Sequence, residues 1–166
     1  LAGRGTQVVV AARGAFQRTG GLPFHPVDVT RPETIRGLIR PGDTVVHLVA
    51  RSPVRRPRGG RRTYHRIHVE GTRNLLRAAE AAGAHRFVYV SALGVTRTAG
   101  AAYAETKARA EDLVRQSPLA TTIVAPSILF SAESEIIALL RGVSRLPVVP
   151  LPQITAPFRP IHVGDA

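Results

Sequence analysis

The chain has no cysteine, which excludes disulfide bonds and thiolate metal sites. It also has no tryptophan or methionine and only five phenylalanines and three tyrosines, so it offers few aromatic surfaces on which nucleic-acid bases could stack. No apolar run approaches the length of a membrane span, and no signal-peptide pattern opens the chain. The six histidines show no convincing metal-ligand spacing. These absences favour a cytoplasmic protein without a metal centre.

Lysine is nearly absent from a strongly basic chain. Lysine and arginine together number 23 against 11 acidic residues, for a net charge of +12, and the only lysine is Lys107. A background preference for arginine spares a lysine only where a compact ammonium is needed, because the guanidinium is a wide planar fork. Lys107 is therefore a candidate functional residue.

The positive charge raises nucleic-acid binding as an alternative. Most arginines are dispersed, however, and the one dense cluster lies in a Pro/Gly-rich stretch that we interpret as a solvated loop: Arg51, Arg55, Arg56, Arg58, Arg61 and Arg62. Nucleic-acid binding thus rests on charge alone and ranks last.

Tyr103 lies four residues before Lys107. In the helix expected over 102–116, positions i and i+4 share a face, so the cation would lie near the phenol and lower its pKa. The alternative is a chance pair of surface residues. His65 and His68 also share a helix face, and we interpret them as a solvated pair.

Short apolar segments alternate with helical patterns along the 166 residues, enough for one domain. We expect strands over 7–12, 24–29, 44–50, 87–91, 121–125 and 161–163, and helices over 30–40, 64–82, 102–116 and around 133–141. The 30–40 helix is expected to start with a capping box of Thr30 and Glu33. This alternation predicts an α/β protein with a mostly parallel sheet. Ligands bind beyond the carboxyl ends of such strands, where we expect Arg13, Asp28, Ala50, Ser91 and Pro126 on one edge.

Seven short motifs follow one another in a fixed order: Asp28-Val29, His47-Leu48-Val49-Ala50, the run 68–76 (HVEGTRNLL), the run 88–94 (VYVSALG), Tyr103-x-x-x-Lys107, Pro126-Ser127 and the run 160–163 (PIHV). Together they resemble the short-chain dehydrogenase/reductase superfamily in its extended and atypical branches. The resemblance is strongest to NAD(P)-binding proteins similar to the nucleotide-binding accessory subunit of respiratory complex I, and to NmrA-like proteins.

The resemblance implies a Rossmann-type doubly wound parallel sheet over residues 1–130, and the beginning of a small substrate-binding lobe over residues 131–166. The family's first strand and Gly-rich phosphate loop have no counterpart, and the chain starts at Leu1 without any methionine. We therefore expect an N-terminally truncated domain, in which Leu1 to Gly5 end a helix. The strands at 7–12 and 44–49 would then face a gap, which predicts poor solubility and weak dinucleotide binding for these residues alone.

The resemblance also implies roles for individual residues. Ser91 would hydrogen-bond a substrate carbonyl, Tyr103 would act as general acid/base, and Lys107 would hold the nicotinamide ribose and depress the pKa of the tyrosine. Together with Arg13, discussed next, the expected cofactor contacts are Asp28, Val29, Val49, Ala50, Ser91, Tyr103, Lys107 and Pro126.

Arg13 adds an expectation about the cofactor. It follows the strand at 7–12, where an acidic residue would grip the ribose hydroxyls of NAD and an arginine accommodates the 2′-phosphate of NADP. No acidic residue occurs before Asp28. The sequence therefore favours NADP over NAD.

Two functions remain open. The first is an NAD(P)(H)-dependent oxidoreductase or epimerase-like enzyme that acts on a small molecule. The second is a non-catalytic NAD(P)-binding protein with a regulatory or respiratory-complex assembly role. The resemblance to the complex I subunit and to NmrA-like proteins favours the second, as do two departures from the family pattern: Ala125 stands where an arginine is usual, and Ser131 stands where a glycine is usual. Gly164 also stands where the family usually has an aspartate. His68 stands where many extended members have an asparagine.

Overall fold

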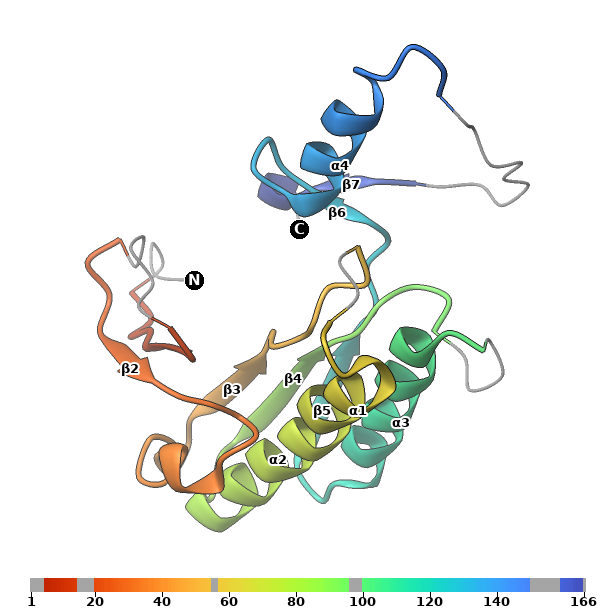
Figure 1. Cartoon of the computed structure of the whole chain (residues 1–166). Helices are drawn as coiled ribbons and strands as arrows, with labels where there is room; N and C mark the ends of the chain where they lie inside the picture. Colours follow the sequence, from red (N-terminus) through yellow and green to blue (C-terminus); the bar gives the residue numbers. More distant parts are fainter. Residues whose placement is uncertain (1–4, 15–19, 55–56, 96–99, 150–158, 166) are drawn as a thin grey trace.

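The computed structural model describes residues 5–14, 20–54, 57–95, 100–149 and 159–165. Its strands pair in parallel. β1 (Val10–Ala12) pairs with β2 (Phe24–Pro26), and β3 (Thr44–His47), β4 (Arg86–Val90) and β5 (Ala120–Val124) form a second sheet in that order. Helices cover one face of β3–β4–β5 (Figure 1). The predicted α/β class with a parallel sheet is confirmed.

The described strands β1 to β5 form two separate sheets. β2 lies beside β1, and β3, β4 and β5 follow one another, whereas no strand of the described residues hydrogen-bonds between β1 and β3. β1, β2 and β3 are shorter than predicted but lie inside their expected ranges. β4 and β5 each begin and end one residue earlier than predicted.

The long helical segment begins earlier than predicted and changes its winding. It comprises α1 (Gly60–Tyr64), a π-helical stretch η3 (His65–Glu70) and α2 (Gly71–Ala82). It ends as expected at Gly83, which has a φ of 69° that a side chain would disfavour. The arginine stretch is accordingly not all loop, because Arg61 and Arg62 lie in α1, while Arg55 and Arg56 lie outside the described residues.

The prediction of a helix over residues 30–40 is wrong. Only a 3₁₀ turn, η2 (Pro32–Thr34), forms there, followed by further turns. The expected capping box is absent, and Asp28 makes the local bonds instead. Its Oδ1 accepts hydrogen bonds from the backbone N (2.9 Å) and Oγ1 (2.7 Å) of Thr30. An Asx-type turn of this kind competes with helix at its own backbone groups, which is why the segment turns without continuing.

α3 (Ala102–Gln116) matches its predicted range and packs against η3 and α2. The core lies between these helices and the sheet and contains Val27, Val29, Ile35, Leu75, Leu76, Ala79, Phe87, Tyr89, Ala110 and Val114. Burying each large apolar side chain contributes roughly 1.5–3 kcal/mol to folding. The helices that carry the candidate site are therefore fixed to the sheet by apolar packing.

Gly71 lets the start of α2 approach the side chain of Val29 closely. A Cβ at this position would lie 2.7 Å from Cγ2 of Val29, closer than packed atoms tolerate. Nδ2 of Asn74, on the same helical segment, donates to the carbonyl of Val29 at 2.9 Å. The start of α2 is thus held against the segment that follows β2.

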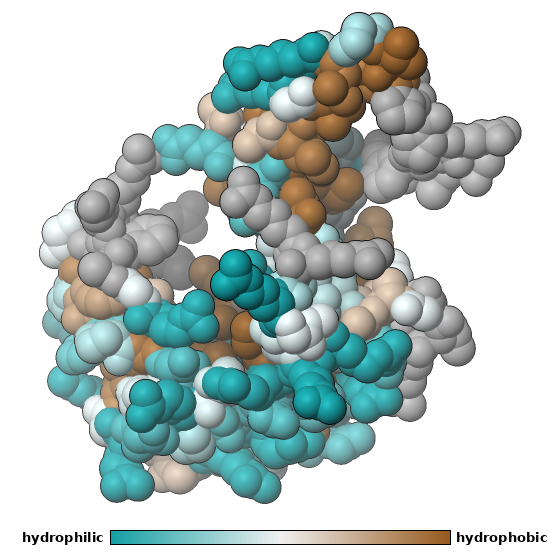
Figure 2. Space-filling view, viewed as in Figure 1, coloured by the Kyte–Doolittle hydropathy of each residue, from teal (hydrophilic) through white to brown (hydrophobic). Residues whose placement is uncertain are grey.

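The C-terminal elements stand apart from the β3–β4–β5 sheet in Figure 1. They are β6 (Leu129–Phe130), α4 (Glu135–Val143), β7 (Ile161–His162) and η4 (Val163–Asp165). β6 was not predicted, and it pairs in parallel with β7. Figure 2 shows apolar surface gathered over α4, whereas the surface over the sheet-covering helices is mostly hydrophilic. In the described parts of the chain, no helix is both long and apolar enough to span a bilayer.

Candidate functional site

The carboxyl ends of β4 and β5 lie side by side and place Ser91 and Pro126 on one edge, as predicted. The backbone N of Ser91 donates to the carbonyl of Val124 at 2.8 Å, and the backbone N of Leu93 donates to that of Pro126 at 2.8 Å. Ser91 is 6% exposed, and its Oγ has no hydrogen-bond partner among the described residues. A buried hydroxyl without a partner costs free energy, so this atom marks a position suited to a ligand group.

Lys107 is fully buried beside the same strand end. Its side chain is 1% exposed, Nζ donates to the carbonyl of Val90 at 2.6 Å, and Nζ lies 4.2 Å from the centre of the Tyr89 ring. Burial lowers the pKa of Lys107 to about 8, although the nearby carboxylate of Glu111 opposes the shift. The ammonium therefore binds the carbonyl of the residue that precedes Ser91, at the carboxyl edge of the sheet.

Tyr103 lies one helical turn before Lys107 on α3 and is partly buried. Its pKa is raised above the usual value because burial disfavours the phenolate, with a further contribution from Tyr64. The expected lowering by Lys107 is therefore wrong for this structure. The ammonium is directed to Val90 and Tyr89, so its charge does not offset the desolvation of the phenol.

His68 also reaches this site, contrary to the prediction of a solvated pair with His65. It is 1% exposed, and its ring meets those of Tyr103 and Tyr64 at 5.5 Å between centroids in each case. Nε2 accepts from the backbone N of Arg51 at 3.0 Å, and Nδ1 lies 2.9 Å from Oγ1 of Thr106. Burial and the charge of Lys107 lower the pKa of His68 to about 4, so the ring is neutral near pH 7.

A second buried imidazole supports the π-helical stretch. Nε2 of His47 lies 3.0 Å from Oγ1 of Thr72, which donates to the carbonyl of His68 at 2.5 Å. The hydroxyl has one proton, so His47 carries its own proton on Nε2. His47 is 2% exposed, and burial lowers its pKa to about 3. Sequence reasoning missed His47, Thr72 and Thr106, although the polar positions on apolar faces were a usable sign.

Asp28, which we expect on the adenine side of the site, is partly buried next to buried Val29. Burial tends to raise the pKa of Asp28, but the hydrogen bonds from Thr30 and the charges of Arg13 and Arg66 lower it overall. Arg13 is exposed directly after β1. Arg13 therefore lies near enough to Asp28 for its charge to lower the pKa of that carboxyl.

The loop after β3 holds the remaining predicted cofactor contacts. Val49 is half-buried and packs against the core, and Ala50 is exposed. The loop is tied to η3 at the next residue, where the backbone of Arg51 donates to His68.

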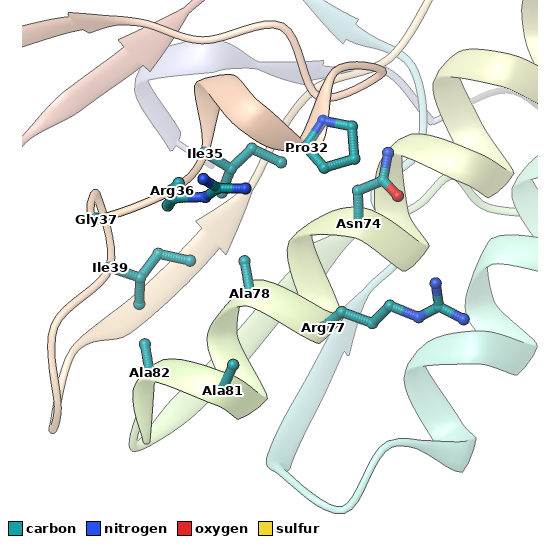
Figure 3. Close-up of a pocket in the computed structure, with 10 residues that line it drawn as sticks. All are labelled: Pro32, Ile35, Arg36, Gly37, Ile39, Asn74, Arg77, Ala78, Ala81 and Ala82. Carbon is teal, nitrogen blue, oxygen red and sulfur yellow. The ribbon is translucent and has the colours of Figure 1, made fainter.

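A pocket lies away from these residues. It has a volume of about 440 Å³ and lies between the η2 turn and α2, with Ile35, Ile39, Ala78 and Ala81 in its lining (Figure 3). Arg36, Arg77 and Asn74 are its polar lining residues. None of the predicted site residues lines it, so the carboxyl edge remains the candidate site.

A family model described as NAD(P)H-binding matches residues 1–145. The chain belongs to this NAD(P)H-binding family.

Two curated relatives agree with this assignment. The chain is 30% identical over 140 residues to a ceramide reductase of Caulobacter vibrioides, covering 84% of the chain and 43% of the relative. It is 25% identical over 174 residues to the mitochondrial NADH-ubiquinone oxidoreductase 40 kDa subunit of Neurospora crassa, covering 99% of the chain and 44% of that subunit. The chain thus spans less than half the length of these relatives.

The fold matches a double mutant of dTDP-glucose 4,6-dehydratase from Streptomyces venezuelae with NAD bound. The TM-score is 0.66 at 23% identity, over 82% of this chain and 53% of the dehydratase. At this identity the match shows the fold alone. The match confirms the predicted Rossmann-type fold, and the family model confirms the predicted resemblance to NAD(P)-binding proteins.

Proposed function

We propose that the chain forms the cofactor-binding and catalytic region of an NAD(P)(H)-dependent oxidoreductase, or epimerase-like enzyme, of the short-chain dehydrogenase/reductase type. One observation carries the proposal. The only lysine of an arginine-rich chain is 1% exposed at the carboxyl end of β4, next to a serine whose buried Oγ has no partner among the described residues.

A buried ammonium is costly, which argues for a function. Removing such a group from water costs several kcal/mol unless hydrogen bonds compensate. Lys107 has three donors, and among the described residues only the carbonyl of Val90 accepts from it. Strongly shifted pKa values in such surroundings are characteristic of functional sites.

The residues present fit the nicotinamide end of a dinucleotide. The remaining donors of Lys107 would bind ribose hydroxyls, and Ser91 Oγ would donate to a substrate oxygen. When bound, the cofactor supplies hydride chemistry. The raised pKa of Tyr103 keeps its proton on the phenol at neutral pH, so Tyr103 would donate a proton to that substrate oxygen. This arrangement favours reduction of a carbonyl group.

NADP(H) is the cofactor that we propose. Arg13 provides a cation at the end of β1, and its charge acts on Asp28 at the end of β2. An arginine at this position suits a 2′-phosphate better than a free ribose diol. We propose that Asp28 and Val29 contact the adenine, and that Val49, Ala50 and Pro126 form the wall beside the cofactor.

We further propose that residues 1–130 form the dinucleotide domain and that residues 131–166 begin the substrate-binding lobe. A pocket of about 290 Å³ lies between Val54 and α4, with Leu139, Val143 and Leu146 in its lining. Its apolar lining favours a carbonyl substrate with an apolar portion. The similarity to a relative named ceramide reductase points the same way.

A non-catalytic NAD(P)-binding role is the second candidate. The relative named as a subunit of NADH-ubiquinone oxidoreductase covers 99% of the chain, which favours a role inside a larger assembly. In that case the dinucleotide would bind without turnover, and Tyr103 would have no proton to transfer.

Turnover in the full-length protein distinguishes the two roles. We would follow NADPH oxidation at 340 nm with carbonyl substrates that carry short and long apolar chains, and measure NADPH binding by fluorescence titration. Tyr103→Phe should abolish turnover and leave NADPH binding within about threefold. Tyr64→Phe is the matched control, because Tyr64 lies beside Tyr103 but donates to the carbonyl of Ser52.

Three results would decide the matter. Loss of turnover in Tyr103→Phe but not in Tyr64→Phe supports the enzyme. Tight NADPH binding without turnover on any substrate supports the non-catalytic role. Absence of NADPH and NADH binding refutes both.

A further inference from the structure

We propose that His68 is a positioning residue that couples the loop after β3 to helix α3, so that the cofactor wall and the tyrosine–lysine pair move as one unit. This inference rests on the proposed function, because it assigns Val49–Ala50 to the cofactor wall and Tyr103 to proton transfer. It concerns the side chain of His68, whose two ring nitrogens bond to two different elements.

The first bond holds the loop. A backbone N–H can only donate, so Nε2 of His68 is the acceptor in its 3.0 Å bond with the backbone N of Arg51. Arg51 directly follows Ala50. The bond therefore fixes the loop at the point where the proposed cofactor wall ends.

The second bond holds the helix. Since Nε2 accepts, the proton of the neutral ring lies on Nδ1, which donates to Oγ1 of Thr106 at 2.9 Å. The hydroxyl of Thr106 in turn donates to the carbonyl of Ala102 at 2.6 Å. Thr106 lies between Tyr103 and Lys107 on α3, so this bond fixes the turn that carries the pair.

The backbone of His68 is anchored as well. Its carbonyl accepts from Thr72, which is supported by His47 on β3. His68 is 1% exposed and lies in the π-helical stretch, where the helix takes up an extra residue. The neutral imidazole, in one tautomer, thus connects the loop after β3 to α3. The backbone carbonyl of His68 connects η3 to His47 on β3 through Thr72.

The contacts on both sides of the ring explain why an imidazole is needed. Asparagine can place its amide near the position of Nδ1 but does not reach Arg51, whereas glutamine places an amide oxygen near the position of Nε2 but offers no donor at that of Nδ1. The two substitutions therefore break one bond each. His68→Asn should release the loop, and His68→Gln should release the helix.

The test uses the full-length protein, with NADPH affinity, turnover and amide hydrogen exchange as readouts. Loss of one hydrogen bond corresponds to roughly a fivefold change. His68→Asn should weaken NADPH binding about fivefold, keep kcat within twofold and speed exchange at the backbone N–H of Arg51. His68→Gln should lower kcat about fivefold, with NADPH affinity and Arg51 exchange unchanged.

Thr106 provides a second route if a histidine variant fails to fold. Thr106→Val removes the hydroxyl at nearly equal volume and should reproduce the kcat loss of His68→Gln. Thr106→Ser keeps the hydroxyl and should have a kcat close to that of the wild type. Equal effects of His68→Asn and His68→Gln on both parameters would indicate a general packing role and overturn the proposal. So would unchanged Arg51 exchange in His68→Asn.

Failure of the proposed function gives a different pattern. If the wild type neither binds nor turns over a dinucleotide, the role in positioning falls with it. Differential exchange at Arg51 in the two variants would then still establish the bridge. If the wild type is active but the variants do not split, the proposed function stands and the coupling by His68 is refuted.

Discussion

The two buried histidines predict that the protein loses stability in mild acid. His47 and His68 are 2% and 1% exposed, and burial lowers their pKa values to about 3 and about 4. In the unfolded chain both imidazoles regain a pKa near 6.5. The unfolded state therefore binds more protons below pH 6.5, and the free energy of unfolding falls as the pH is lowered.

The magnitude follows from the proton uptake of the unfolded state. Between pH 7 and pH 5 an imidazole of pKa about 6.5 goes from about one-quarter to almost fully protonated, whereas each native imidazole remains neutral over this interval. Linkage gives a loss of roughly 2 kcal/mol per histidine, or roughly 4 kcal/mol for both. This is a large fraction of the roughly 5–15 kcal/mol of unfolding free energy that is typical of folded domains.

Other groups contribute little in this pH interval. Asp28 has a lowered pKa, so its stabilisation is present above the unfolded value and is lost only in stronger acid. Lys107 has a lowered pKa of about 8 and changes charge only at higher pH. The two histidines should therefore dominate the slope.

Urea denaturation followed by circular dichroism at pH 5, 6 and 7 measures this slope. His47→Gln and His68→Gln should each remove about half of it, whatever their effect at pH 7. His85→Asn is the control, because His85 is exposed and should leave the slope unchanged. An unfolding free energy that is constant within about 1 kcal/mol from pH 7 to pH 5 would refute the reasoning.

Three further predictions concern single positions. Gly71→Ala should destabilise the protein by about 1–3 kcal/mol in urea denaturation, because its Cβ would lie 2.7 Å from Cγ2 of Val29, and adding Val29→Ala should relieve the clash; an unchanged midpoint for Gly71→Ala would contradict this. Arg13→Ala should weaken NADPH binding at least tenfold without affecting NADH in fluorescence titrations, and equal NADPH and NADH affinities in the wild type would show the assignment to be mistaken. Lys107→Arg should reduce kcat/KM as much as Lys107→Ala, because the guanidinium does not fit the ammonium's position; wild-type activity would exclude this reasoning.

The strand–helix alternation could be predicted from the sequence because buried parallel strands leave a simple apolar pattern. The carboxyl-edge positions of Ser91 and Asp28 followed directly from it. The predicted helix after Thr30 failed because the carboxylate of Asp28 takes the backbone bonds that a helix start needs. That competition depends on a side-chain orientation that the residue order does not reveal.

The positions of the candidate site residues could be predicted from the sequence, but the direction of the Tyr103 pKa shift could not. The i, i+4 spacing of Tyr103 and Lys107 placed them on one helix, but the charge of Lys107 is directed to Val90 and Tyr89, so the pKa of Tyr103 rises. The burial of His68 was missed because the π-helical stretch rotates the following residues away from regular helical spacing.

Lys107→Met in the full-length protein tests the central claim most directly, with thermal stability and NADPH affinity measured on the same sample. An unbranched apolar side chain fills the space and removes the cost of the buried ammonium. The account predicts an equal or higher Tm together with at least a tenfold loss of NADPH affinity. A lower Tm with unchanged NADPH affinity would contradict it, because Lys107 would then serve the fold and not the cofactor.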